Sequence, residues 1–458
     1  MNYVAAIDLG TTKVVALVGH KTPYGCKVVA YSETPSNGIM RGEVVNIQNV
    51  VGAIKPCIDD LQKKIGEKIT KVYVGIAGQH IRCQSECNVL NRSNDKDISI
   101  EEINQLEQNM YRARVEPGEE VLHVIPQCYH VDDFLEIGNP VGMMGKRIEA
   151  NYRLFIGRTN SAEFSKRCVV QLGLKLEQLI LEPLASAKAV LKDDEKELGV
   201  AMVDIGGGTT DLLIYKNNVI RYAAVIPFGG NIITEDVRQG CCVTLRQAEK
   251  LKIQYGSCYS DLSPEHKTIT VSGIGEREHR EISFRMLAKV IEARMEELME
   301  AILYYIDISG YAEQLMAGIV FTGGAALTTN LTHYVKYKTG YEARVAKPEN
   351  FTQDSCPEIV HPAYSCAVGL LMQGIEHQET KQKPASLNIN KGILTLFGLV
   401  NSEPEEKVQK PKLVVAEKRV PKREPNGVVD PLPKREKVKR PAVSEKLAGW
   451  LALVDNQA

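Results

Sequence analysis

Asp8-Leu-Gly-Thr-Thr-Lys13 and Asp204-Ile-Gly-Gly-Gly-Thr-Thr-Asp211 are two versions of one motif, placed far apart in the chain. Each lies between two apolar, β-type runs. The first copy is flanked by residues 4–7 and 14–17, and the second by residues 200–203 and 212–215. The pattern predicts a strand, a tight turn rich in Gly and Thr, and a second strand. One copy alone is most often only a hairpin, but two copies in equivalent strand contexts at domain-scale separation indicate an internal duplication that binds phosphate.

The residues of both turns are suited to a phosphorylated ligand. Glycines let the backbone N–H groups approach an anion, Thr hydroxyls add donors, and a carboxylate at a strand end can hold Mg²⁺ through water. Two such hairpins facing each other would grip a nucleoside triphosphate from both sides. The sequence therefore predicts a phosphate clamp.

A third element follows the hairpins, in Ile319-Val-Phe-Thr-Gly-Gly-Ala-Ala-Leu327. An apolar run is followed by Gly-Gly and an expected helix start. Gly-Gly after a strand lets the backbone lie against a flat ligand such as adenosine. Taken alone, the segment is equally well explained as an ordinary strand–helix turn. With the two hairpins it forms a third part of one clamp.

Composition is that of a globular protein with two or three domains in 458 residues. Strands and helices alternate through most of residues 1–376, which indicates an α/β fold. The eleven cysteines lack paired CxxC spacing, so we interpret them as reduced and not as metal ligands. We expect no cleavable signal, and no apolar stretch approaches the ~20 residues of a membrane span.

Charge is distributed unevenly along the chain. From residue 407 onward there are 13 basic and 6 acidic side chains, a net charge of +7, whereas residues 1–406 carry a net charge of −8. An acidic body with a basic tail predicts that the tail contacts something anionic. We expect no nucleic-acid partner.

Three segments are more informative than the rest. Residues 83–161, with a charged helix over 100–114, have the character of an inserted subdomain. Residues 284–303 form a strongly amphipathic helix. Residues 377–442 lose periodicity and are rich in Pro, Lys and Glu, which predicts a disordered linker. Within that linker, residues 392–400 are an apolar island that is either a docking motif or a clip onto the body.

The last residues predict an amphipathic, membrane-targeting helix over 443–455. Its apolar stripe is formed by Leu447, Trp450, Leu451 and Val454, which are spaced i, i+3, i+4 and i+7. Tryptophan suits a membrane interface, and the basic residues within 434–440 can meet anionic headgroups. The alternative is a terminal helix that docks back onto the body, although a long tether makes docking less natural.

The order of hairpin, hairpin and Gly-Gly turn resembles the actin-type ATPase superfamily, whose two similar lobes enclose ATP. The resemblance implies that Glu249 and Lys252 face the nucleoside, although by sequence alone they would be a solvated helix face. Glu182 would orient an attacking water, unless its role beside Pro183 is structural. The implied ATP contacts are Gly10, Thr11, Thr12, Lys13, Gly206, Gly207, Gly208, Thr209, Thr210, Gly323, Gly324 and Ala325, with Asp8 and Asp204 near Mg²⁺.

Residues 121–133, 139–145 and 228–236 closely resemble the bacterial cell-division protein FtsA, whose extra subdomain 1C lies at this position, unlike in actin or the rod-shape protein MreB. The likeness covers residues 1–375. It implies an actin-like, two-lobed ATPase fold with an inserted 1C subdomain, followed by the linker and the terminal helix. The implied division is 1–82 and 162–196 for lobe I (1A), 83–161 for 1C, 197–228 and 304–376 for lobe II (2A), and 229–303 for 2B.

The resemblance also implies a function. The body would bind ATP and assemble into filaments, and 2B would hold the C-terminal peptide of the tubulin-like protein FtsZ. The terminal helix would then tether the division ring to the cytoplasmic face of the membrane, where 1C is a candidate contact for later divisome proteins. Lys289 and Arg294 either meet the acidic peptide or are solvated helix charges.

The clamp requires ATP binding but not efficient hydrolysis, so we expect at most a slow ATPase. The alternatives are a small-molecule kinase and a chaperone-like ATPase of the same superfamily. A kinase needs a base beside a substrate pocket and has no use for an amphipathic tail. A chaperone would carry a β-rich peptide-binding domain, and nothing after residue 376 has that strand density.

Overall fold

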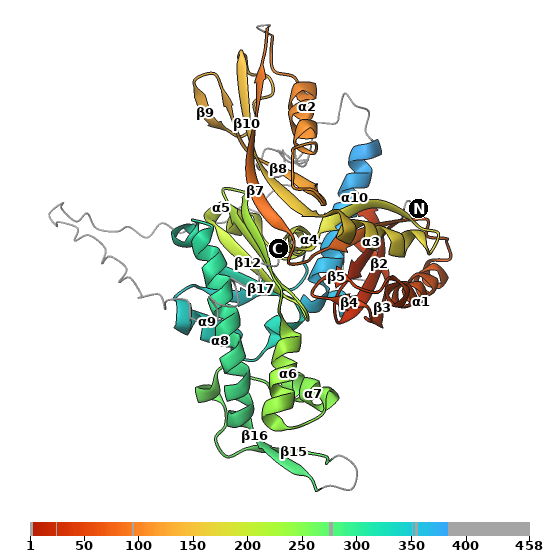
Figure 1. Ribbon diagram of the computed structural model, residues 1–458, viewed down its shortest axis with the longest axis vertical. Coiled ribbons are helices and arrows are strands. Elements are labelled where there is room, and N and C mark those ends of the chain that lie inside the picture. Colours follow the sequence, from red (N-terminus) through yellow and green to blue (C-terminus); the bar gives the residue numbers. More distant parts are fainter. Residues whose placement is uncertain are drawn as a thin grey trace, which may run out of the picture.

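The computed structural model describes residues 3–23, 25–93, 96–273, 278–349, 351–352 and 356–382. In these residues, two sheets form the centres of two lobes (Figure 1). The first sheet contains β1 (Val4–Leu9), β2 (Lys13–Thr22), β3 (Gly25–Pro35), β6 (Lys71–Ile76), β11 (Lys175–Leu181) and β19 (Phe351–Thr352). The second contains β12 (Val200–Ile205), β13 (Thr210–Lys216), β14 (Val219–Ile226), β17 (Ile319–Thr322) and β18 (Ala343–Val345).

The two sheets share one topology. Their strand orders are β11-β6-β1-β2-β3-β19 and β14-β13-β12-β17-β18. In each sheet three consecutive strands run antiparallel, and two later strands add in parallel beside the first of the three. Both Gly/Thr turns connect the first two strands of their sheet. The predicted duplication is confirmed by this repeated strand order.

Strand β1 shows why the hairpin strands are apolar on both faces. Its residues are all buried, and alternate side chains enter different cores, as the two-residue period of a strand requires. Ala5, Ile7 and Leu9 pack on the side of α1 (Ile47–Ile65). Val4 and Ala6 face the core between the lobes. A strand covered on both faces therefore reads as a continuous apolar run.

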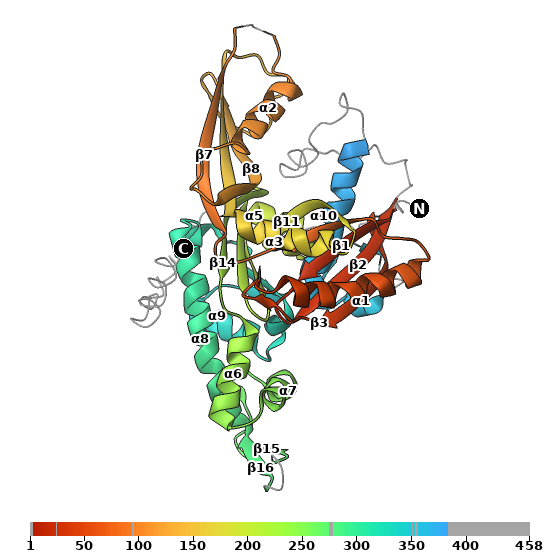
Figure 2. The same cartoon turned by 45° about the vertical axis from the view of Figure 1, so that its right-hand side comes forward.

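Two arms extend from the lobes toward opposite ends of the molecule (Figure 2). The upper arm is a four-stranded antiparallel sheet in the order β7-β10-β8-β9, with α2 on one face. Its elements are β7 (Arg82–Asn91), α2 (Ile100–Met110), β8 (Glu119–Val131), β9 (Phe134–Ile137) and β10 (Arg147–Arg158). Helix α2 begins with a capping box between Ser99 and Glu102 and ends four residues before the predicted end of the charged helix.

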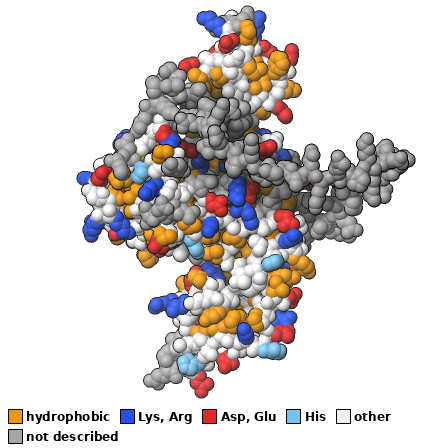
Figure 3. Space-filling model, turned by 180° about the vertical axis from the view of Figure 1, so that it is seen from behind, with side chains coloured by type: hydrophobic (Ala, Val, Ile, Leu, Met, Phe, Trp, Pro, Cys, Tyr) orange, Lys and Arg blue, Asp and Glu red, His pale blue; other side chains and the backbone are white. Residues whose placement is uncertain are grey.

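The lower arm contains α6 (Gly230–Cys241), α7 (Leu245–Tyr255), the hairpin β15 (Thr268–Val271) and β16 (Arg280–Ser283), and the first turns of α8 (Phe284–Ile308). Helix α8 is the predicted amphipathic helix, and it runs five residues further than expected. Hydrophobic side chains gather on the surface of both arms (Figure 3). In the lower arm, the exposed ones include Leu245, Ile253, Tyr255 and Met286.

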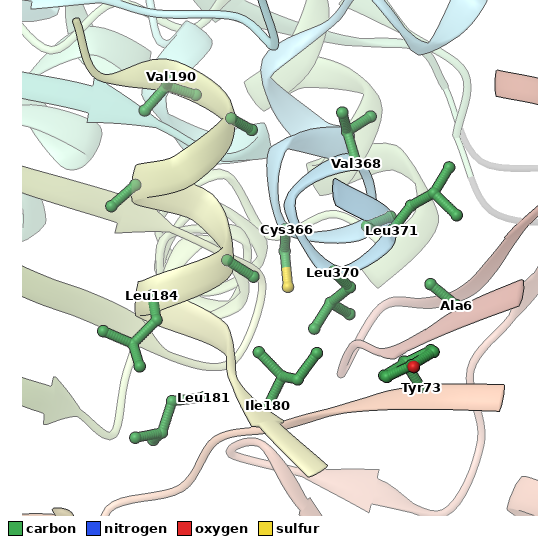
Figure 4. Close-up of a cluster of buried hydrophobic side chains, with 14 of the residues drawn as sticks. Ala6, Tyr73, Ile180, Leu181, Leu184, Val190, Cys366, Val368, Leu370 and Leu371 are labelled. Atoms are coloured by element: carbon green, nitrogen blue, oxygen red, sulfur yellow. The ribbon is translucent and has the colours of Figure 1, made fainter. Parts of the chain in front are cut away.

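Helices α4 (Glu182–Val190) and α10 (Ser365–Gln382) lie between the two sheets, in a core that contains residues of both lobes (Figure 4). Leu184 and Leu370 are two of its buried side chains. The helices cross so closely that a methyl group on Gly369 would overlap the Ala185 carbonyl group. This crossing lies directly beneath the site described below.

The C-terminal part of the described chain differs from the expected division, in which 304–376 belonged entirely to lobe II. Strand β19 pairs with β3 of the first sheet, and α10 packs against α4, β1 and β2. Helix α10 also continues to Gln382, past the expected start of the linker at 377. An apolar helix pattern reports burial but not the lobe against which the helix is buried.

The remaining helices cover the outer faces of the lobes. Helix α3 (Thr159–Val170) packs beside α1 on the first lobe, and α9 (Leu331–Thr339) packs beside β18 on the second. The short α5 (Asp193–Leu198) and the hairpin of β4 (Ile39–Met40) and β5 (Glu43–Val44) complete the lobes. The rest of the linker, the 392–400 island and the terminal helix lie outside the described residues. Among the residues that are described, no helix is long and apolar enough to cross a membrane.

Candidate functional site

A cleft of about 380 Å³ opens between the two lobes. Its walls include both Gly/Thr turns, the Gly-Gly turn and the start of α4. The predicted site residues that line it are Asp8, Gly10, Thr11, Thr12, Lys13, Glu182, Asp204, Gly206, Gly207, Gly208, Thr209, Glu249, Lys252, Gly323, Gly324 and Ala325. Thr210 is the exception, because its buried hydroxyl donates a 2.9 Å hydrogen bond to the Phe228 carbonyl and serves the fold.

The two Gly/Thr turns touch across the cleft. A methyl group on Gly207 would overlap the Thr12 hydroxyl, and a methyl group on Gly208 would lie 2.5–2.8 Å from the Thr11 side chain. Only glycines let the two turns approach this closely. A ligand between the lobes would therefore meet the backbone of both turns at once.

Backbone hydrogen bonds hold the second turn in shape. The Gly206 N–H donates to the Thr209 carbonyl at 2.9 Å. The first two residues of α6 then bind the turn, since Gly230 N–H donates to Gly206 and Asn231 N–H donates to Gly207, at 2.9 and 2.8 Å. The turn and the start of α6 thus form one unit.

The Gly-Gly turn requires glycine at its first position. Gly323 has a φ of +88°, and a methyl group there would overlap the Asp204 carboxylate. Its N–H donates to the Pro362 carbonyl at 3.2 Å. Gly324 begins a 3₁₀ turn that ends at Leu327, where the sequence predicted a helix start, and the next α-helix begins at Leu331.

Glu249 and Lys252 form an ion pair on α7 at the edge of the cleft, and do not simply face solvent. The Lys252 ammonium is 2.8 Å from Glu249 and donates to the Gly230 carbonyl at 3.0 Å and to the Thr234 hydroxyl at 2.8 Å. Thr234 in turn donates to Glu249. Lys252 therefore fixes the start of α6 beside the cleft, while Ile253 adds an apolar wall.

Four carboxyl groups gather at the floor of the cleft: Asp8, Glu182, Asp204 and Asp211. Removal from water, followed by the charge of Asp204, raises the pKa of Asp8 to about 7. Desolvation also raises the pKa of Asp204 to about 6, against a 2.6 Å hydrogen bond from Ser186 that lowers it. The pKa values of Glu182 and Asp211 are raised well above their usual range by burial and by the neighbouring carboxylates.

This cluster lacks positive charge. Lys13 lowers the pKa of Asp8, but its ammonium is ion-paired with Glu33 at 2.8 Å and lies 3.5 Å from the centre of the Tyr364 ring. The buried Asp211 Oδ1 accepts no hydrogen bond from the described residues. Burial and mutual repulsion oppose ionisation of these carboxyl groups, and a bound cation would relieve that cost. Their hard oxygen donors fit Mg²⁺, which binds carboxylates while keeping several waters. Asp8 and Asp204, on the facing hairpins, would hold it.

Sequence reasoning missed several cleft residues. Asp211 could have been found, because it closes the second motif, whereas the first motif has no carboxylate there. Asn231 lies within residues 228–236, which resemble FtsA, but nothing local marked it as a ligand contact. Cys366 and His361 arrive from the far end of the chain, and no local signal placed them at the cleft.

His123 joins the upper arm to the strand that precedes Glu182. It lies on β8, is buried, and accepts a 3.2 Å hydrogen bond from the Leu181 N–H. Burial lowers its pKa from 6.5 to about 4, against a backbone hydrogen bond with Leu179 that raises it. The imidazole is therefore neutral in the folded protein near pH 7.

We predict that His123 makes the protein lose stability in mild acid. Below pH 6.5 the imidazole of His123 takes up a proton in the unfolded chain, whereas in the folded chain it does so only below about pH 4. The folded state should lose about 2 kcal/mol from this group between pH 7.5 and 5. Urea unfolding followed by circular dichroism at both pH values should give a correspondingly smaller loss in His123→Gln. The exposed His333→Gln should keep the wild-type loss, and an unchanged loss in His123→Gln would contradict the prediction.

The repeated lobes and the phosphate-suited cleft define an actin-like protein. The fold matches the PilM-PilN type IV pilus biogenesis complex with a TM-score of 0.56 and 13% identity, covering 81% of this chain and 98% of that chain. It also matches MreB5 of Spiroplasma citri bound to ADP, with a TM-score of 0.52 and 15% identity over 83% of this chain and 99% of that one. At these identities the likeness shows the fold alone.

Sequence comparison identifies the family. Residues 201–369 match the family model "Cell division protein FtsA", and residues 78–156 match "SHS2 domain inserted in FTSA", which corresponds to the upper arm. The chain is 36% identical to cell division protein FtsA of Pseudomonas aeruginosa over 377 residues, 82% of this chain and 90% of that protein. With FtsA of Escherichia coli it shares 35% identity over 383 residues, 81% of this chain and 90% of that protein. The chain belongs to the FtsA family and is an actin-like cell-division protein.

Proposed function

We propose that this protein binds Mg²⁺–ATP between its lobes, assembles into filaments, and tethers the FtsZ ring to the cytoplasmic face of the membrane. The observation that carries the nucleotide part is the contact of Gly207 and Gly208 with Thr11 and Thr12 across the cleft. Both turns present backbone and hydroxyl donors to one space, and the carboxyl cluster below it suits a cation. MreB5 of Spiroplasma citri, which shares the fold, is bound to ADP in its solved structure.

Different residues of the cleft would bind different parts of the nucleotide. Gly10 to Lys13 and Gly206 to Thr209 would hold the phosphates from opposite lobes, and Gly323 to Ala325 would carry the nucleoside. Mg²⁺ would supply positive charge to the phosphates and to the carboxylates. Glu182 lines the cleft and is the residue that would orient water, and burial raises its pKa well above the usual range. A clamp on the phosphates requires ATP binding but not efficient hydrolysis, so we propose binding with at most slow hydrolysis.

The lower arm is the proposed site for the C-terminal peptide of FtsZ. Away from the cleft, helix α7 exposes Leu245 and Tyr255, and α8 exposes Lys289. Arg294 is less available than expected, because it is 2.6 Å from Asp236 and also pairs with Glu297. An acidic peptide with apolar side chains would therefore meet Lys289 and the apolar side chains of α7 rather than Arg294.

Membrane attachment is proposed for the sequence over 443–455. Burying four large apolar side chains yields roughly 6–10 kcal/mol, and ordering about eleven residues removes a similar amount. One copy is thus a marginal, reversible anchor. Several copies on one filament bind much more firmly through effective concentration. We propose that ATP-dependent assembly converts weak attachment to firm attachment.

Liposome co-sedimentation tests the tether. The full chain should sediment with anionic liposomes, more so with ATP, and should carry FtsZ with it. A chain that ends at Arg440 should remain in solution. Trp450→Glu should weaken binding by at least about 30-fold, because about 2 kcal/mol of apolar burial is lost. Asn456→Glu adds the same charge outside the apolar stripe and should bind nearly as the parent does.

Two outcomes would contradict the proposal. If liposome binding survived the loss of residues 441–458, the proposed membrane tether would be wrong. Equal binding with and without ATP, under conditions in which only ATP supports filaments, would remove the coupling between assembly and attachment. The two parts of the proposal are therefore tested separately.

A further inference from the structure

We propose that the nucleotide-free cleft binds a thiophilic divalent cation, Zn²⁺, through Cys366, Asp8 and Glu182, and that this ion excludes Mg²⁺–ATP. One ligand atom from each of the three residues lies within 4.8 Å of the other two. The residues come from α10, β1 and α4, and all three line the cleft. The exclusion of ATP rests on the proposed function, whereas the ion site does not.

The three side chains converge because α10 crosses the base of the cleft. Figure 4 shows the Cys366 sulfur directed from α10 toward the space beside α4. Cys366, Asp8 and Glu182 are each only 9% exposed. In a tetrahedral zinc site with oxygen and sulfur ligands, the ligand atoms are separated by about 3.3–3.7 Å. Rotations that move each atom by about 1 Å therefore complete the site.

The charge balance of the cleft favours a bound cation. Asp8 and Glu182 are buried carboxyl groups, and Lys13 is ion-paired with Glu33. Asp211, in the same cleft, has a buried oxygen with no hydrogen-bond partner among the described residues. A divalent ion here replaces protons: the Cys366 thiol releases its proton to solvent on binding, and the thiolate and carboxylates share the ion's charge.

The thiol decides which ion fits. Mg²⁺ demands oxygen ligands in octahedral geometry, whereas Zn²⁺ and Cd²⁺ bind Cys sulfur readily. Cys366 is the sole thiol among the residues that line the described cleft. Three protein ligands leave a fourth position open for water, as in many zinc sites. Since Asp8 is also the proposed partner of Mg²⁺, the two ions would compete for its carboxylate.

Cadmium titration of the full, nucleotide-free chain tests the site, because Cd²⁺ bound to a thiolate gives a charge-transfer band in the ultraviolet. The parent should show a band that Cys366→Ser loses, with Cd²⁺ affinity at this site reduced at least about 100-fold, since a direct ligand outweighs the 10–100-fold of an outer-shell partner. Zn²⁺ should displace the Cd²⁺. The exposed Cys87→Ser and Cys242→Ser are matched controls and should retain the band.

Competition with nucleotide tests the exclusion. Zn²⁺ should raise the apparent Kd for Mg²⁺–ATP in the parent but not in Cys366→Ser. The site is overturned if parent and Cys366→Ser give the same cadmium spectrum and affinity, and the exclusion is overturned if Zn²⁺ binds without affecting ATP. If neither protein binds ATP at all, the proposed function fails while the spectra still decide the ion site. Cys366→Ala and thermal unfolding of each variant separate loss of a ligand from loss of folding.

Discussion

Replacing Gly207 by alanine is expected to weaken ATP binding by at least about 100-fold. The added methyl group overlaps the Thr12 hydroxyl and lies 3.2 Å from Asn231 Oδ1, so either the Thr12 hydroxyl rotates out of its place in the cleft or the two turns move apart. Each phosphate hydrogen bond lost in this way removes about 1.5–3 kcal/mol, and two such losses exceed a 100-fold change in Kd. Isothermal titration of the full chain with Mg²⁺–ATP measures the effect.

Gly52→Ala is the matched control for this substitution. Gly52 lies within α1, and a methyl group there meets no atom within 4 Å. Alanine also favours a helix interior over glycine by roughly 0.5–1 kcal/mol, so this variant should bind ATP normally and be slightly more stable. If Gly207→Ala bound ATP as tightly as Gly52→Ala, the two turns would not form one phosphate clamp.

Gly369→Ala is expected to lower the free energy of unfolding by about 3 kcal/mol. The methyl group would overlap the carbonyl oxygen and the carbonyl carbon of Ala185, which are backbone atoms of the opposite helix. Backbone atoms of two packed helices cannot rotate away as a long side chain can, so α4 and α10 must separate and leave poorly packed surfaces. Urea unfolding followed by circular dichroism measures the loss, with Gly52→Ala again as control.

The same substitution should disturb the cleft. Glu182 is the first residue of α4, and Cys366 is the second of α10, so separation of the helices moves two of its floor residues. Cadmium affinity should therefore fall in Gly369→Ala even where the protein remains folded. An unfolding midpoint equal to that of the parent would mean that the helix crossing tolerates a wider spacing.

Local patterns were enough to predict the two hairpins and the amphipathic face of α8. Each depends on residues that are neighbours in the chain: an apolar run, a turn that needs glycine, and a second apolar run. The repeat of the motif indicated an internal duplication, and the family resemblance supplied the two-lobed fold. Most of the predicted residues that line the cleft lie within the turns themselves, whereas Glu182, Glu249 and Lys252 were named from the resemblance.

The predictions made from local patterns failed where a contact with a distant part of the chain decides the structure. Thr210 stands in the motif beside Thr209, but the strand alternates its side chains, and Thr210 turns inward to the Phe228 carbonyl. The segment after β18 was assigned to the second lobe because nothing in its sequence names the lobe that covers it. Strand β19 instead pairs with β3, which precedes it by more than three hundred residues.

The sequence by itself therefore determined the duplicated hairpins, the glycines that let a ligand approach, and the kind of ligand they suit. Only the tertiary structure decided which charges share the cleft. It brought Glu182 and Cys366 close to Asp8, because helices α4 and α10 cross between the lobes, and it left Asp211 Oδ1 with no hydrogen-bond partner among the described residues. The crossing buries four carboxyl groups and one cysteine close together. Burial and mutual repulsion oppose ionisation of the carboxyl groups, and a bound cation would offset both effects.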